Sequence, residues 1–226
     1  MKKIILFTLL ISAFSVNLVS AQFTGKRFIS GEAAVTFGSS NPDESKATNG
    51  YGYGINVNFG KFKTETRASG WNLSTSLQGR KEYYNINNVE TSVNGIRSVG
   101  GGIGHFWHFY KHFNDNFGIF GGPGIALNYV FDRRIEYPQG TAYEQKNHTV
   151  SASLDISAGG YYKLNERWWL LASLGFSQPV GVSFSAGSST NMNDGVKSIN
   201  HGLSYGFSPQ ITFPSVGLGL RYFFRD

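Results

Sequence analysis

Cysteine is absent from this chain of 226 residues. The fold therefore has no disulfide framework, and thiolate catalysis and cysteine-ligated metal sites are excluded. Clusters of basic residues are also missing: the 20 Lys and Arg residues are spread along the chain and leave a net charge of only +6. Nucleic-acid binding, which typically needs clustered Lys and Arg, is not expected.

The one long apolar run lies at the N-terminus. Lys2 and Lys3 precede the run Ile4–Val19, and Ser20 and Ala21 supply the small residues typical of a cleavage site. A membrane anchor is the alternative, but polar residues interrupt the run. We therefore expect residues 1–21 to be a cleaved secretory signal peptide and residues 22–226 to form one exported domain.

The rest of the chain is rich in glycine, with 29 residues, and in aromatic residues, at 15%. In "GYGYGINVNFG", Tyr, Ile, Val and Phe alternate strictly with Gly and Asn, and "GWNLSTSLQGR" and "TVSASLDISAGGYY" repeat the pattern. A period of two residues predicts β-strands with one apolar face and one small or polar face.

Eight segments carry the signs of strands: Arg27–Gly38, Gly50–Phe62, Gly70–Tyr84, Gly95–Tyr110, Phe117–Phe131, Thr149–Lys163, Arg167–Phe184 and Tyr205–Phe224. Pro123 cannot donate to a strand ladder, so we expect a bulge there. In "VGGGIGHFWHFY" the glycines leave the facing of Arg97, His105 and His108 open. Three short connections alternate with four long polar ones, which predicts an all-β, eight-stranded antiparallel up-and-down barrel with both termini at its short-turn end.

The polar face indicates where this barrel sits. It consists of glycine, serine and asparagine with isolated charges, whereas aromatic residues lie at the ends of the apolar face, as in a barrel with lipid outside. By alternation Glu32, Arg80, Asp155 and Arg221 point into the lumen, where we expect a structural polar core; a gate or a ligand site is the alternative. Glu32 and Arg221 are the expected ion pair, because closure makes the first and last strands neighbours. The expected amide partners in the lumen are Asn56, Asn58, Gln78 and Asn128.

The closing strand, "GLGLRYFF", places Leu218, Leu220, Tyr222 and Phe224 on one face. With the signal peptide, strand count and loop pattern, it resembles the small eight-stranded outer-membrane barrels of Gram-negative bacteria, the class typified by OmpX and the OmpA barrel, over the whole mature chain. In that family the last strand ends on an aromatic residue, whereas here Arg225 and Asp226 follow. The resemblance implies an outer-membrane location with periplasmic termini, surrounding lipid, and recognition by the barrel-assembly machinery.

Some members of that family are lipid A deacylases or palmitoyltransferases that use His and Ser, with an acid in the deacylases. The residues available here are His148 with Ser151 and Glu144, or His201 with Ser204 and Asp194; neither set has a recognisable motif. His105, His108 and His112 have a spacing that suits a helix face, whereas a strand scatters them over both faces, so no metal site is expected.

Three functions remain open. The first is a non-catalytic outer-membrane barrel without a cofactor, serving in envelope structure or in surface interaction through its long loops, which could bind an extracellular ligand. The second is a lipid A-modifying enzyme. The third is a soluble secreted β-barrel that binds an apolar ligand, which would require the apolar face to point inward.

Overall fold

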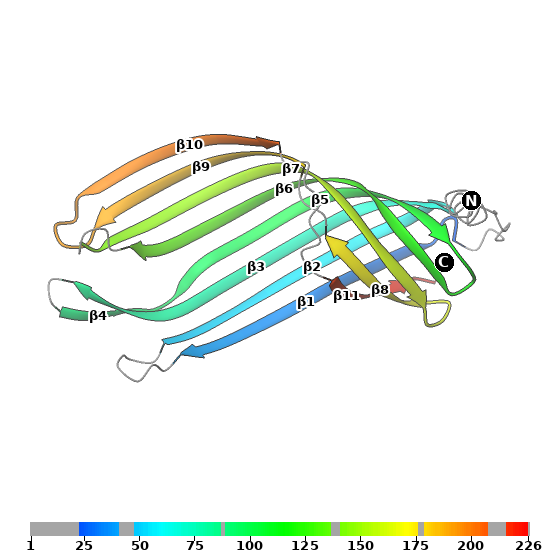
Figure 1. Ribbon diagram of the computed structural model, residues 1–226, viewed down its shortest axis with the longest axis horizontal. Helices are drawn as coiled ribbons and strands as arrows, with labels where there is room; N and C mark the ends of the chain where they lie inside the picture. Colours follow the sequence, from blue (N-terminus) through cyan, green and yellow to red (C-terminus); the bar gives the residue numbers. More distant parts are fainter. Residues whose placement is uncertain are drawn as a thin grey trace, which may run out of the picture.

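The computed structural model describes residues 23–40, 48–86, 89–136, 141–175, 179–207 and 216–225, so the predicted signal peptide lies outside the described residues. These residues form strands joined by turns and short irregular segments. Their bounds are β1 Arg27–Ser40, β2 Thr48–Thr64, β3 Arg67–Ile86, β4 Val89–Val93, β5 Ile96–His112, β6 Phe117–Glu136, β7 Tyr143–Lys163, β8 Trp168–Gly175, β9 Val180–Asn191, β10 Lys197–Phe207 and β11 Val216–Phe223 (Figure 1). In this part of the chain, no helix reaches the length and apolarity required to cross a membrane.

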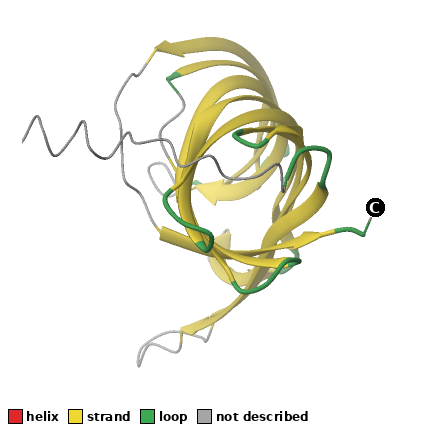
Figure 2. Cartoon of the chain, turned by 90° about the vertical axis from the view of Figure 1, so that its right-hand side faces the viewer, coloured by secondary structure: helices red, strands yellow, loops and turns green. Residues whose placement is uncertain are grey.

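The strands form a closed antiparallel barrel of eight positions. The ladder runs β7, β6, β5, β3, β2, β1, β11 and β8, and β8 pairs again with β7 (Figure 1). Seen from the short-turn end, the strands surround a central lumen (Figure 2). The predicted all-β, eight-stranded antiparallel barrel is confirmed.

Strands extend well beyond the predicted limits, into segments expected to be long loops. β3 and β4 pair from Glu82 to Val93, β6 and β7 pair as far as Glu136 and Tyr143, and β9 and β10 pair as far as Lys197. Polar residues there suggested loops, but a hairpin that projects past an apolar band needs no apolar face to keep its backbone paired.

The two predicted C-terminal strands are each divided. The segment expected as Arg167–Phe184 forms β8 and β9, and the segment expected as Tyr205–Phe224 forms β10 and β11, with 208–215 outside the described residues. As a result, the strands that close the ring pair over a short length. β1 pairs with β11 only over Phe28–Gly31. Among the described strands, the rest of β1 pairs only with β2, and β10 pairs only with β9.

Pro123 does not produce the expected bulge. The β5–β6 ladder pairs Phe106 with Gly124 and Phe109 with Gly121, which is one continuous register on either side of the proline. The two intervening residue pairs are missing from the ladder, consistent with the absent N–H of proline. The other edge of β6 remains paired, with Pro123 opposite Ile156.

The buried core lies inside the barrel at its short-turn end. We call it the aromatic plug, and its rings are Phe23, Phe28, Phe62, Phe106, Tyr110, Phe120, Tyr161, Trp169 and Phe223. Phe62 and Trp169 are fully buried. The segment before β1 completes the plug: the backbone N–H of Phe23 donates to the Glu65 carboxylate at 3.0 Å, and the Phe23 ring packs edge-on against Trp169.

Inward-facing glycines make room for these rings. A Cβ atom on Gly60 would lie 2.3 Å from the Phe28 ring, and one on Gly159 would lie 2.6 Å from the Phe120 ring. Gly54, also on β2, has no atom within 4 Å of the corresponding position. Close packing of the plug therefore depends on the missing side chain at particular strand positions.

Gly60→Ala is expected to reduce the free energy of unfolding by about 1–3 kcal/mol, because the added methyl group overpacks the Phe28 ring. Gly54→Ala, on the same strand, is the matched control and should change stability by no more than about 0.5 kcal/mol. Urea unfolding of the refolded protein in detergent, followed by tryptophan fluorescence, measures both. Equal effects of the two substitutions would contradict this account of the plug.

Candidate functional site

The lumen is the candidate site, and Arg221 marks its limit at the short-turn end. Its side chain is 2% exposed; Nη1 donates to the Tyr110 hydroxyl at 2.8 Å, and the guanidinium lies 4.0 Å from the centre of the Phe28 ring. The rings of Phe120 and Trp169 lie within 6 Å. Arg221 is therefore held by cation–π contacts inside the aromatic plug.

The expected ion pair between Glu32 and Arg221 does not form. The β1–β11 register places Ser30, not Glu32, opposite Arg221, and the guanidinium lies over Phe28. Glu32 and Asp155 do line a cavity of about 410 Å³ together with Arg221, next to the plug on the side away from the short turns. The structure thus brings three of the four predicted lumenal charges to one cavity without joining Glu32 to Arg221.

Amide and hydroxyl groups dominate this middle level of the lumen. The Asn72 amide nitrogen donates to the side-chain oxygens of Asn56 at 2.5 Å and of Asn58 at 3.0 Å. Between β5 and β7, His108 hydrogen-bonds Ser157 at 2.9 Å. These contacts satisfy polar groups within the barrel, as a structural polar lumen requires.

Arg80, the fourth predicted charge, lies in a separate cavity, farther from the short-turn end. That cavity, of about 680 Å³, is lined by four arginines and Asp132, along with Gln78, Gln145 and Asn147. Gln78 and Asn147 face Ser98 and Asp132, respectively, across neighbouring strands. We call this cavity the arginine vestibule; its arginines are Arg80, Arg97, Arg133 and Arg134.

A β-bulge places Arg97 in the vestibule. Gln78 pairs with Ser98 while Gly79 pairs with Ile96, so Arg97 is the extra residue on β5. Arg97 is 7% exposed, whereas Ile96 is 43% exposed on the outside. Bulges re-aim side chains in this way. Strict alternation from the outward residues Ile103 and Trp107 would have placed Arg97 on the outer face, and the glycine-rich sequence around it gave no signal of the bulge.

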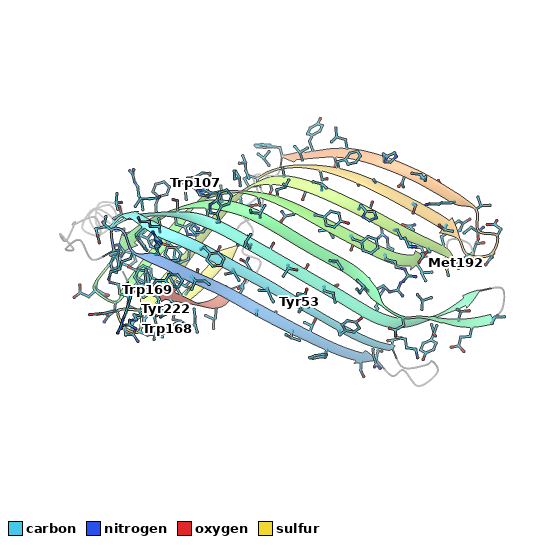
Figure 3. The ribbon with its side chains drawn as sticks, turned by 180° about the vertical axis from the view of Figure 1, so that it is seen from behind. Tyr53, Trp107, Trp168, Trp169, Met192 and Tyr222 are labelled. Atoms are coloured by element: carbon cyan, nitrogen blue, oxygen red, sulfur yellow. The ribbon has the colours of Figure 1, made fainter. Side chains whose placement is uncertain are left out.

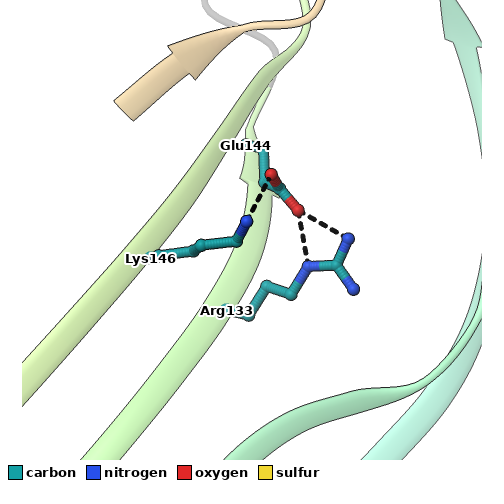
Figure 4. A network of polar contacts seen from close by, with 3 residues as sticks. All are labelled: Arg133, Glu144 and Lys146. Atoms are coloured by element: carbon teal, nitrogen blue, oxygen red, sulfur yellow. Dashed lines mark hydrogen bonds and ion pairs between the residues drawn. The ribbon is translucent and has the colours of Figure 1, made fainter. Parts of the chain in front are cut away.

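Arg133, one of the vestibule residues, also belongs to a charged network that joins β6 and β7. Arg133 contacts the Glu144 carboxylate through Nε at 2.6 Å and Nη2 at 2.5 Å, and Lys146 contacts its other oxygen at 3.0 Å (Figure 4). Partial burial alone would raise the pKa of Glu144, but hydrogen bonds from Lys146 and Arg133, with their charges, hold that pKa below its ordinary value.

The structure does not assemble either predicted catalytic set. His148 and Ser151 are an odd number of residues apart on β7 and face opposite sides of the sheet; His148 bonds the Tyr129 hydroxyl at 2.8 Å. Glu144 belongs to the charged network described above.

The second set is equally dispersed. His201 stacks on Phe184, while Ser204, on the other face of β10, contacts Ser183 at 2.7 Å. Asp194 binds the side chain of Asn191 and the backbone N–H of Val196 within the β9–β10 turn. Each of these groups thus has a local structural partner.

The three histidines of β5 occupy both faces. His105 lies outside, between Trp71 and Trp107, with ring centroids 4.9 and 4.5 Å away. His108 faces the lumen, and His112 contacts Tyr161 and the backbone oxygen of Glu65 at the plug. The described residues contain no group of three or more His, Cys, Asp or Glu arranged to hold a metal ion.

The predicted assembly residues of the closing strand face outward. Leu218 is 69% exposed, Leu220 48% and Phe224 44%. The Tyr222 ring lies 4.9 Å from Trp168 on the neighbouring strand, and both rings sit at the short-turn end (Figure 3). Phe223, between Tyr222 and Phe224 in sequence, points into the plug.

Arg221→Ala is expected to lower the free energy of unfolding by about 2–5 kcal/mol, because it leaves a void among the plug rings. Arg221→Met should cost less than about 1.5 kcal/mol, since the cost of burying a charge offsets much of its attraction to the rings and to Tyr110. Urea titration in detergent compares the variants. If methionine is as damaging as alanine, the charge rather than the packing is what stabilises the plug.

Comparison with known proteins finds similarity among solved structures. No family model and no curated protein matches the chain. Among solved structures it is similar to the outer membrane protein OprG from Pseudomonas aeruginosa, with 13% identity and a TM-score of 0.42 over 92% of this chain and 100% of that one. The strand ladder itself, and not this distant likeness, establishes the barrel fold.

Proposed function

We propose that the protein is an integral outer-membrane β-barrel with a non-catalytic role in the cell envelope. The observation that carries the proposal is the direction of the two strand faces. Apolar side chains cover the outside at mid-barrel, with Leu127 at 52% and Leu154 at 46% exposure, while asparagine and serine line the lumen at the same level. A bilayer accounts for an apolar exterior of this extent, whereas water would not.

The height of the apolar exterior matches a membrane. On β6, the outward face runs from Phe117 to Tyr129, or 129 − 117 = 12 residue steps. Those steps span about 40 Å along the strand, at about 3.3 Å each. A strand tilted by about 45° then crosses about 28 Å, close to the apolar band of about 25 Å typical of these barrels.

Aromatic residues border this band at both ends. At the short-turn end, Trp168, Tyr222 and Phe117 point outward. At the other end Tyr129 bonds His148, and the Arg133–Glu144–Lys146 network follows immediately beyond. Rings at the headgroup level followed by charges in water are typical of an interface.

The aromatic plug supports a role other than open diffusion. It fills the short-turn end of an eight-stranded barrel whose interior is only wide enough for side chains. Envelope structure or surface interaction through the extended hairpins remains the proposed role, with lipid as the surroundings and the barrel-assembly machinery as the partner during insertion. We also propose that export removes residues 1–21 and that the termini of the mature chain lie in the periplasm.

The alternatives lack a supporting observation. A soluble barrel for an apolar ligand needs its apolar face inward, and the described strands have the opposite orientation over the middle of the barrel. For a lipid A-modifying enzyme, neither His148 nor His201 lies with its predicted partners.

Fractionation followed by an SDS gel tests the proposal. We expect the processed chain in the outer-membrane fraction, and we expect the unboiled sample to migrate differently from the boiled one, because a closed barrel in detergent resists unfolding by SDS. Recovery in the soluble fraction without any heat-dependent shift would contradict the proposal.

A further inference from the structure

Folding gathers basic residues at the short-turn end of the barrel, although the sequence spreads them along the chain. Apart from Arg221 inside the plug, nine described residues contribute: Lys26, Arg27, Lys61, Lys63, Arg67, Lys111, Lys163, Arg167 and Arg225. The described acids of the same end are Glu65, Asp115 and Glu166, which leaves a formal charge of 9 − 3 = +6. Adding Asp226, which lies outside the described residues, and a carboxylate at the chain end still leaves 6 − 2 = +4.

Four of these residues face outward on three neighbouring strands. We call them the basic belt: Arg27 on β1, Lys61 and Lys63 on β2, and Arg67 on β3. All four are exposed, whereas the residues next to them in sequence, Phe28, Phe62 and Ala68, are buried inside the barrel. Because β1, β2 and β3 are consecutive in the ladder, the belt is one continuous patch on the outer surface.

The belt has no counter-charge within the protein. The β1–β2 register puts Arg27 directly opposite Lys61, so two like charges face each other on adjacent strands. Glu65 lies in the turn between β2 and β3, but its carboxylate accepts hydrogen bonds from the backbone N–H groups of Phe23 and Thr24. In the part of the chain that the structure describes, none of the four belt residues forms an ion pair.

The belt lies just beyond the outward rings of the apolar exterior. Lys61 is two residues past Phe59, which is 43% exposed, and the Arg67 guanidinium lies 5.8 Å from the centre of the Phe109 ring. Two residues span about 7 Å along a strand, or about 5 Å along the membrane normal at a tilt of about 45°. Lys and Arg side chains at this distance from an apolar band reach the headgroup level.

Position and chemistry favour a phosphate group as the missing anion. The belt faces sideways, toward the surroundings of the apolar exterior, which in the proposed membrane setting are lipid headgroups. Ammonium and guanidinium groups donate hydrogen bonds to phosphate oxygens, and an anionic membrane surface attracts basic residues close to it. A phosphate between Arg27 and Lys61 would relieve their mutual repulsion.

We infer that the basic belt binds the phosphates of anionic phospholipids in the leaflet at the short-turn end, with Arg27 and Lys61 sharing one headgroup. This inference rests on the proposed membrane location and deepens it, because it names the class of lipid and the residues that hold it. The belt covers three of the eight strand positions, so the lipid is held on one side of the barrel. In the proposed orientation this leaflet is the periplasmic one.

The lipids retained by the reconstituted barrel test the inference. The protein is inserted into vesicles of equal parts phosphatidylglycerol and phosphatidylcholine and extracted in a mild uncharged detergent, and the retained lipids are counted by mass spectrometry. The test variant, Arg27→Gln with Lys61→Gln, removes the two facing charges. The matched control, Lys81→Gln with Lys197→Gln, removes two charges at the opposite end of the barrel.

We expect the native protein and the control variant to retain phosphatidylglycerol over phosphatidylcholine by at least about fivefold, since one basic residue near an anionic surface contributes roughly that factor. The preference should fall as salt rises. The test variant should retain a preference of no more than about twofold.

A third variant separates charge repulsion from lipid binding. Lys61→Glu puts an acid opposite Arg27, so it should raise the urea midpoint in uncharged detergent while it lowers the preference for phosphatidylglycerol. This variant decides the matter if the double variant does not fold. A lower urea midpoint, or an unchanged lipid preference, would contradict the belt.

The heat-dependent gel shift of the same samples reports on the barrel itself. A folded native protein without a preference for phosphatidylglycerol would overturn the belt and leave the proposed barrel intact, whereas a native protein without the shift would contradict the proposed function. An equal loss of preference in the control variant would overturn the belt, because net charge alone would then explain the binding. Belt-dependent co-sedimentation with isolated peptidoglycan, without a lipid preference, would also overturn it and assign these residues to a cell-wall polymer.

Discussion

Four residue pairs, from Phe28–Phe223 to Gly31–Leu220, join β1 to β11 and turn the sheet into a ring. In a lipid environment, every backbone N–H and C=O must find its partner within the protein, and only a closed ladder provides this for strands. Closure also fixes which side chains meet in the lumen. The same short ladder brings Phe28, Phe223 and Arg221 inside, so the plug is built where the ring closes.

The plug explains how a charge is kept in the interior of a narrow barrel. Several aromatic faces surround the Arg221 guanidinium, and one phenol accepts its hydrogen bond. Cation–π contacts of this kind are worth about 2 kcal/mol when desolvated, which offsets part of the cost of burying the charge. Farther from the short-turn end, amides and hydroxyls line the lumen in place of the rings, and beyond them arginines line it. The polarity of the interior thus increases from the plug to the opposite end of the barrel.

Alternation along the strands predicted the barrel and much of its facing correctly. The outward residues of β2 and β6, from Tyr51 to Phe59 and from Phe117 to Tyr129, lie where a period of two residues places them. Alternation describes a single strand, however, and says little about the neighbours. The register that puts Ser30 opposite Arg221, the bulge at Arg97 and the extended β9–β10 hairpin all depend on pairing between segments.

The aromatic plug was missed for a related reason. Its inward rings, such as Phe62, Tyr110 and Tyr161, occupy the ends of strands, where outward aromatic girdle residues were expected. Both faces are aromatic at that end, and composition cannot separate them. The inward glycines offered the available signal: Gly60 and Gly159 stand where rings from neighbouring strands need space, but which ring fills each position follows only from the register.

The absence of cysteine allows the most direct test of the inside-out arrangement, because single cysteines can be placed without competing thiols. Leu127 and its neighbour Asn128 lie within the apolar band on β6 and face opposite ways. With a nitroxide label at Leu127→Cys or Asn128→Cys in protein reconstituted into lipid vesicles, the accessibility of each label to oxygen and to a water-soluble nickel complex can be measured by electron paramagnetic resonance. The account predicts that the label at 127 is reached mainly by oxygen, which dissolves in lipid, and that the label at 128 is much less accessible to it. Equal accessibility at both positions, or the reverse order, would contradict an apolar exterior in contact with lipid.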